Sequence, residues 1–172
     1  MKFDTPEWRA ERDRRLLEWM NGDAQSADLL VTLFHIGEVW DDLIDKDKPV
    51  TDDQINEAFV LALFDLTGNP FFARHASFLR PIMLMGMNSW MDSVSYERSG
   101  DPHWQTWAFV LRNWYMEMVT ACAFLTGGYD HMRGAGKQAR AFFQTETLDE
   151  YREELNLVAR PAAEVLHAPA TQ

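Results

Sequence analysis

Three aspartates close together, Asp41, Asp42 and Asp45, are the residues in this sequence best suited to chemistry. In a helix, residues three or four positions apart share one face, so Asp45 lies beside both of the others. Clustered carboxylate oxygens suit a hard cation such as Mg²⁺, which binds one or two carboxylates together with the phosphate oxygens of a substrate. The spacing therefore predicts a divalent metal site with a diphosphate as its ligand. No residue pattern indicates a catalytic group.

A helix from about residue 25 to residue 45 is expected to position these carboxylates. On its helical wheel, His35 and Glu38 fall on the same arc as the aspartates, and we predict that they lie beside the metal site. The opposite arc is apolar, and we expect Leu33 and Trp40 to be buried while Asp42 and Asp45 keep solvent access. Acids at a helix C-terminus oppose the macrodipole by ~0.3–1 kcal/mol each at exposed sites. That cost favours a functional role, although a solvated helix end with clustered acids remains the alternative.

Charge narrows the classes of partner. The sequence has a net charge of −11, and residues 38–57 carry eight acidic side chains against two lysines. Such a surface repels the phosphates of nucleic acids and anionic lipids. The expected partners are a metal cation, a phosphate bridged by a metal, or a basic patch on another protein.

Composition predicts one soluble helical domain over residues 1–172, with a short flexible tail from about residue 168. The sequence is 47% hydrophobic and 13% aromatic, which is too apolar for a disordered chain, and Cys122 is the single cysteine. No apolar run approaches the ~20 residues of a membrane span, and the charged N-terminus does not resemble a secretory signal. A cytoplasmic location is the resulting expectation.

The predicted helix boundaries rest on capping residues. Two capping boxes are expected, at Thr51–Gln54 and Thr147–Glu150, and a cap residue followed by proline opens three further helices. These three starts are at Thr5-Pro6, Asn69-Pro70 and Asp101-Pro102. We expect the helix after Asn69 to be interrupted near Arg80-Pro81, the helix after Asp101 to reach Thr126, and residues 127–137 to form a mobile loop. The helix after Thr147 is expected to bend at Pro161. The fold class is an all-α bundle.

The segment from Val39 to Asp47, with its D-D-x-x-D spacing, resembles the first aspartate-rich motif of isoprenoid synthases, especially the squalene and phytoene synthase branch. Thr147 to Tyr151, followed by Val158-Ala159, is similar to a second helix of those enzymes, with Arg160 in place of the usual glycine. The resemblance implies an all-helical fold around a cavity, with Mg²⁺ bridging Asp41, Asp42 or Asp45 to an allylic diphosphate. No second aspartate-rich motif follows.

Asn113 and Glu117 are the nearest substitute for that second motif, because Asn113-x-x-x-Glu117 resembles fragments of the Asn/Ser/Glu metal motif of terpene cyclases. Together with Thr106 and Thr120 they form a polar stripe on an otherwise apolar helix. Such a stripe either faces a cavity or is an exposed strip of a surface helix. If it faces the cavity, Asn113 and Glu117 join His35 and Glu38 around the metal.

A non-enzymatic reading competes with the metal hypothesis. In it, the chain is a helical interaction, assembly or inhibitor protein whose acidic face binds a basic partner. A third class, the helical nucleotide pyrophosphohydrolases, would need paired E-x-x-E and E-x-x-D elements, and only Glu38-x-x-Asp41 approximates half of these.

The methionines at 83, 85, 87 and 91, with Trp90, predict a homodimer or a partner protein on segment 81–98. Phe59, in contrast, is predicted to be buried within the chain.

Overall fold

The computed structural model describes residues 5–46 and 48–155, and all regular secondary structure in these ranges is helical. The helices are α1 (Pro6–Trp19), α2 (Ala24–Asp45), α3 (Asp52–Val60), the π-helical η1 (Leu61–Asp65), α4 (Leu66–Gly68), α5 (Pro70–Glu97), α6 (Pro102–Leu111) and α7 (Tyr115–Phe143). A further helix starts at Leu148 and continues to Leu155. The predicted all-α class is confirmed. Pro161, Val158-Ala159 and the tail from residue 168 lie outside the described residues.

The predicted capping residues open the helices as expected. Thr51 accepts a hydrogen bond from the backbone N–H of Gln54, while the Gln54 side chain accepts one from the N–H of Thr51. Thr147 and Glu150 form the second reciprocal pair. Thr5, Asn69 and Asp101 cap the starts of α1, α5 and α6, each with proline at the first helical turn. These are local contacts of two or three residues, which is why the sequence pattern reveals them.

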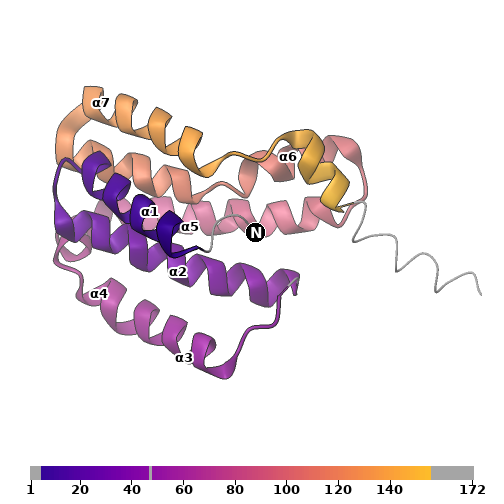
Figure 1. Cartoon of the computed structure of the whole chain (residues 1–172), viewed down its shortest axis with the longest axis horizontal. Helices are drawn as coiled ribbons and strands as arrows, with labels where there is room; N and C mark the ends of the chain where they lie inside the picture. Colours follow the sequence, from indigo (N-terminus) through magenta and orange to yellow (C-terminus); the bar gives the residue numbers. More distant parts are fainter. Residues whose placement is uncertain (1–4, 47, 156–172) are drawn as a thin grey trace, which may run out of the picture.

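The core lies among α1, α2, α5 and α7 (Figure 1). Among its fully buried side chains are Leu16, Trp19, Met20, Leu29, Leu30, Phe71, Leu79, Met118, Val119 and Cys122. Leu33 is buried as predicted, whereas Trp40 is only half-buried and packs on Trp90 with the ring centroids 4.1 Å apart. No helix among the described residues is long and apolar enough to cross a membrane.

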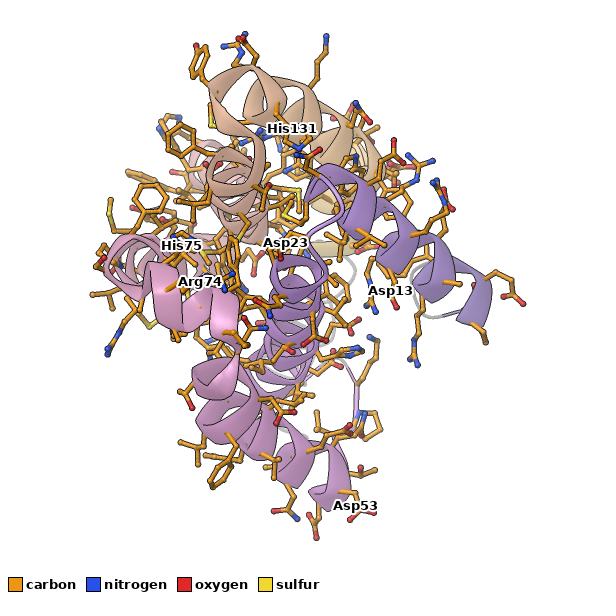
Figure 2. The ribbon with its side chains drawn as sticks, turned by 90° about the vertical axis from the view of Figure 1, so that its left-hand side faces the viewer. Asp13, Asp23, Asp53, Arg74, His75 and His131 are labelled. Carbon is orange, nitrogen blue, oxygen red and sulfur yellow. The ribbon has the colours of Figure 1, made fainter. Side chains whose placement is uncertain are left out.

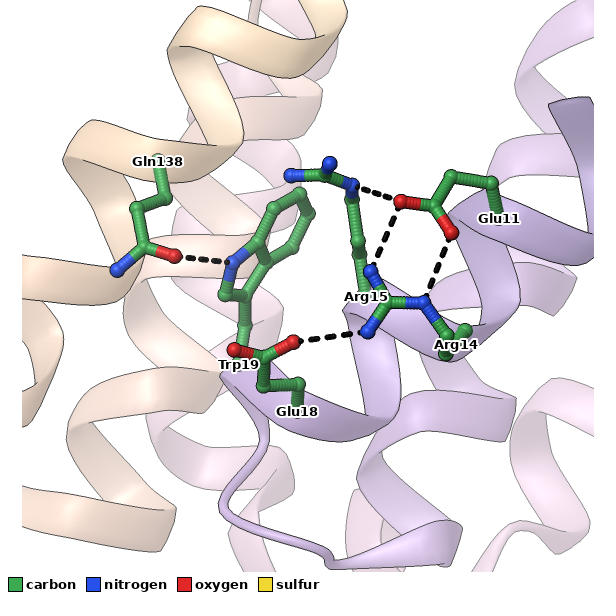
Figure 3. A network of polar contacts seen from close by, with 6 residues as sticks. All are labelled: Glu11, Arg14, Arg15, Glu18, Trp19 and Gln138. Atoms are coloured by element: carbon green, nitrogen blue, oxygen red, sulfur yellow. Dashed lines mark hydrogen bonds and ion pairs between the residues drawn. The ribbon is translucent and has the colours of Figure 1, made fainter.

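Polar and aromatic contacts join α1 to α7, and Figure 3 shows the contact between Trp19 and Gln138 beside a polar network within α1. The Trp19 indole N–H donates to Gln138 of α7 at 3.3 Å. On the exposed side of α1, hydrogen bonds from Arg14 and Arg15 lower the pKa of Glu11 to about 2. The guanidinium of Arg12 is buried 4.8 Å from the centre of the Phe34 ring. This cation–π contact helps to accommodate a charged side chain in the interior.

The prediction that residues 127–137 form a loop was wrong. Gly127 and Gly128 do turn the chain, with φ at +75° for Gly128, but residues 129–143 form the second leg of a helical hairpin within α7. Glu117 on the first leg pairs with Arg140 on the second at 2.8 Å, which shows that the legs are antiparallel neighbours. Gly136 permits this close packing, because a Cβ there would lie 3.0 Å from the Thr120 hydroxyl oxygen.

Two helix boundaries also differ from the prediction. α5 runs through Pro81 without interruption, because core contacts on both sides, such as Leu79 and Met83, hold its two halves in line. The helix that begins after Asp101 ends at Leu111, and a turn over residues 112–114 precedes α7. α6 packs on α5, and the turn redirects the chain from α6 into α7.

Candidate functional site

The three predicted metal ligands lie in the last two turns of α2, which ends at Lys46 in a left-handed conformation with φ of 58°. Asp41 points toward α5, where its carboxylate accepts a hydrogen bond from the Trp90 indole N–H at 3.0 Å. Trp90 is buried against Trp40, so this bond fixes the direction of the Asp41 side chain.

Asp42 and Asp45 face different basic side chains. The Asp42 carboxylate lies 3.5 Å from the ammonium of Lys48, and its side chain is only 17% exposed. Asp45 lies 3.8 Å from the guanidinium of Arg98, which also donates to the Ile44 carbonyl at 3.2 Å. Arg98, at the end of α5, thereby places a positive charge at the C-terminus of α2 and offsets part of the macrodipole penalty of the aspartates. Both aspartates keep contact with solvent, as predicted.

Asp45 has the most perturbed electrostatics of the three. Partial burial, and then the nearby carboxylates of Asp41 and Glu97, raise its pKa to about 6, against the opposing effect of Arg98 and Arg112. A carboxyl group with such a pKa holds a proton more tightly than an isolated surface aspartate does.

Four residues that the sequence analysis did not select complete this end of the bundle. Tyr151 is buried and donates its phenolic proton to Glu97. Arg112 lies against the Tyr151 ring, 4.9 Å from its centre, and 3.5 Å from the Glu146 carboxylate. Burial alone would lower the pKa of Arg112, but the charges of Glu97 and Glu146 outweigh it and raise the pKa. We call Asp41, Asp42, Asp45, Glu97, Arg98, Arg112, Glu146 and Tyr151 the α2-end cluster.

Only Tyr151 carried any sequence signal, as part of the Thr147–Tyr151 segment. Nothing local distinguishes Glu97, Arg112 or Glu146 from other charged residues at helix ends. They meet because α5, the turn after α6 and the helix from Leu148 converge, and the contacting residues lie up to 54 positions apart.

The predicted neighbours of the metal are divided among three hollows. His35 lines a 520 Å³ hollow between α2 and the residues 61–70, and burial followed by Arg12 lowers its pKa. Glu38 and Asn113 share a 190 Å³ hollow. Glu117, held by Arg140, lines a third hollow of 640 Å³ together with Asn113 and Thr120.

The polar stripe thus faces a cavity at Asn113, Glu117 and Thr120. Its fourth member, Thr106, instead accepts a hydrogen bond from Arg152. Within residues 5–46 and 48–155, no group of three or more His, Cys, Asp or Glu side chains has the arrangement of a metal site. Asp41, Asp42 and Asp45 are among these residues, so the metal hypothesis rests on their spacing in the sequence and not on a metal-site arrangement in the structure.

A second surface of interest, formed by α3, η1 and α4, runs along the outside of α2. We call residues 52–68 the arm. Neither α3 nor η1 contains a buried residue, and four large apolar side chains point outward. These four, which we call the ridge, are Phe59 at 63%, Val60 at 51%, Leu63 at 61% and Phe64 at 67% exposed. The prediction that Phe59 is buried was wrong, because the arm packs on α2 with its other face, through Ile55, Ala58 and Leu61.

The methionine segment also faces outward. Met85, Met87 and Met91 are exposed, at 71%, 37% and 50%, while Met83 packs against the core. The homodimer or partner predicted for segment 81–98 stays a prediction.

Comparison with protein-family models, with curated protein sequences and with solved structures gave no match. The class that the fold defines is an all-α helical bundle.

Proposed function

We propose that this chain is a helical interaction protein that binds a partner through the arm. The proposal rests on the ridge, because its four large apolar side chains, each more than half exposed, lie together on one face of the arm. Full burial of such a side chain contributes about 1.5–3 kcal/mol. A contiguous exposed apolar patch is the usual mark of a protein-binding surface.

Charge indicates what kind of partner suits the arm. Residues 51–68 contain Asp52, Asp53, Glu57 and Asp65 and no lysine or arginine. All four acids are exposed beside the ridge. The complementary surface is an amphipathic helix with an apolar stripe flanked by lysine or arginine, since apolar contact supplies affinity and the flanking charges supply orientation and rate.

The π-helical turn is a further reason to assign the function to the arm. η1 interrupts the α-helical hydrogen bonding over Leu61–Asp65, and two members of the ridge, Leu63 and Phe64, belong to it. Such turns are less favourable than α-helix and occur frequently at functional sites.

A helical probe peptide of leucine and lysine, titrated against the protein by calorimetry, tests this function. We expect binding that weakens with salt, and a loss of at least about tenfold in affinity for Leu63→Glu with Phe64→Glu. Leu84→Glu is the matched control, because Leu84 is equally exposed, at 69%, but lies on α5. Equal loss in both variants, or equal affinity for a peptide with glutamate in place of lysine, contradicts the assignment to the arm.

A second candidate function is the binding of Mg²⁺ and a diphosphate at Asp41, Asp42 and Asp45. What favours it is the presence of cationic side chains beside the carboxylates: Lys48 at 3.5 Å from Asp42 and Arg98 at 3.8 Å from Asp45. Carboxylates hold the metal in Mg²⁺-diphosphate complexes, and lysine or arginine contacts the remaining phosphate oxygens.

Thermal unfolding in millimolar Mg²⁺, with and without pyrophosphate, tests the second candidate. A ligand that binds only the folded protein stabilises it by about 2.7 kcal/mol at a hundredfold excess over Kd. We expect Mg²⁺ to raise Tm, pyrophosphate to raise it further, and Asp42→Asn with Asp45→Asn to abolish both effects. If Mg²⁺ acts no differently from NaCl of matched ionic strength, the metal function is refuted.

A further inference from the structure

The 640 Å³ groove lies between α5, the end of α6 with the turn after it, and both legs of α7. Trp114 forms part of its wall beside Gly86, where a Cβ would lie 2.8 Å from the indole ring. Large apolar side chains surround it and are themselves exposed: Phe78 at 43%, Met85 at 71%, Val110 at 61%, Phe124 at 41% and Tyr129 at 62%. The groove is therefore a second unpartnered apolar surface, concave where the ridge is convex.

The second leg of α7, from which Tyr129 and Met132 line the groove, carries the opposite charge from the arm. Residues 128–143 contain three basic side chains against Asp130, whereas α5 carries Arg74 and Arg80 against Asp92 and Glu97. Glu117, on the first leg, lines the groove and is paired with Arg140. Arg74, Arg80, Arg133 and Lys137 are exposed. In a chain with a net charge of −11, the second leg of α7 is thus locally basic, whereas the arm carries four acids and no base.

Ridge and groove lie on different parts of the molecule. In Figure 2, Asp53 at the start of the arm and His131 in the hairpin of α7 are at opposite ends of the view, and Arg74 of α5 lies between them. The arm packs on α2, and α3 and η1 have no extensive contact with α5, α6 or α7. The ridge therefore cannot fill the groove of its own molecule, but it is free to enter that of a neighbour.

We propose that this protein self-associates head to tail, with the ridge of one copy inserted in the groove of the next. This inference rests on the proposed function of the arm and names its partner as a second copy of the chain. The contact joins two different surfaces, so each copy keeps one free ridge and one free groove. Such heterologous contacts produce rings when the rotation closes and open filaments when it does not.

Two variants that each block one side of the contact test the proposal. The ridge variant carries Leu63→Glu with Phe64→Glu, and the groove variant carries Val110→Glu. All three positions are exposed in the monomer, so the fold should persist, which circular dichroism and thermal unfolding check. By sedimentation velocity, we expect the mean mass of the wild-type particles to rise with protein concentration. It should either pass that of a dimer without limit, as in an open filament, or level off at the mass of a closed ring. Each variant alone should stay monomeric.

The mixture of the two variants is decisive. The groove variant supplies an intact ridge and the ridge variant an intact groove, so the mixture should form a 1:1 dimer that grows no further. A wild type that is monomeric at hundreds of micromolar overturns the proposal. So does a groove variant that still associates by itself, because the contact is then isologous between ridges. A mixture that stays monomeric while the wild type associates also overturns it.

Failure of self-association and failure of the proposed function are distinguishable. The monomeric groove variant retains the ridge and can be titrated with the leucine–lysine peptide. Peptide binding without self-association leaves the arm as a binding surface for a different protein and overturns only the head-to-tail contact. Absence of both overturns the two proposals together.

Discussion

At the scale of single residues, Asp45 shows how strongly the tertiary environment changes a side chain that the sequence presents as one of three equivalent acids. Asp41 is fixed by Trp90, Asp42 lies beside Lys48, and Asp45 is partly buried near Asp41 and Glu97. Its pKa of about 6, against an ordinary value of 3.8, means that the folded protein holds a proton that the unfolded chain has already released. Ionised Asp45 therefore opposes folding.

The pH dependence of stability follows from this shift. Because the folded state binds the extra proton between about pH 4 and pH 6, the contribution of Asp45 to the free energy of unfolding falls as pH rises through that window. Above about pH 6 the destabilisation is complete. For a half-exposed carboxyl we expect about 1 kcal/mol, after reduction for solvent screening.

Asp45→Asn should accordingly raise the free energy of unfolding at pH 7 by about 1 kcal/mol and flatten its pH dependence between pH 4 and pH 6. Urea unfolding at several pH values, with a chelator present, measures both effects. Asp92→Asn is the control, since it removes one charge from an exposed position near the C-terminal end of α5. If both variants have the same pH profile, the environment assigned to Asp45 is wrong.

At the scale of elements, the hairpin of α7 depends on two neighbouring glycines with different roles. Gly128 has φ of +75°, which an L side chain rarely adopts, and a Cβ on Gly127 would lie 2.4 Å from the ring of His131. His131 cannot easily move away, because its ring nitrogen lies 2.7 Å from the Trp19 carbonyl oxygen. The hairpin thereby connects α7 to the end of α1.

We expect Gly127→Ala and Gly128→Ala each to lower the free energy of unfolding by roughly 1–3 kcal/mol. Gly134→Ala is the matched control on the second leg of the hairpin. It lies in open space within a helix, so alanine should raise stability by about 0.5–1 kcal/mol. Denaturant unfolding measures all three variants. A stabilising effect at Gly127 would show that the turn is more relaxed than the geometry indicates.

Helix starts were predictable from the sequence, whereas helix continuations were not. Thr51 and Gln54, or Asn69 and Pro70, act within three residues, so their effect survives in any tertiary context. Pro81 and Gly134 usually end helices, yet both lie inside one here because packing on neighbouring helices outweighs their intrinsic preference. The turn at residues 112–114 carries neither proline nor glycine, and its position depends on the docking of α6 against α5.

At the scale of the whole molecule, the exposed apolar side chains gather on two separate surfaces, and the charged residues near these surfaces differ in sign. The arm combines acids with the convex ridge, and the groove is lined in part by Tyr129 and Met132 of the second leg of α7, which also carries the exposed Arg133 and Lys137. Neither surface is needed to complete the core, which α1, α2, α5 and α7 form with smaller contributions from the arm. This separation lets the protein bury its own interior and still present two apolar surfaces to partners.

The sequence by itself determined the helical class, the capped starts, the burial of Leu33 and the acidic end of α2. Each depends on composition or on contacts within one or two helical turns, which the order of residues specifies directly. Only the tertiary structure decided that Phe59 faces solvent. The arm has apolar residues on two faces, and which face is buried depends on how the arm packs against α2. The tertiary structure also decided that Glu97, Arg112 and Tyr151 surround Asp45, because residues so distant in sequence meet only when packing of the core sets the positions of their helices.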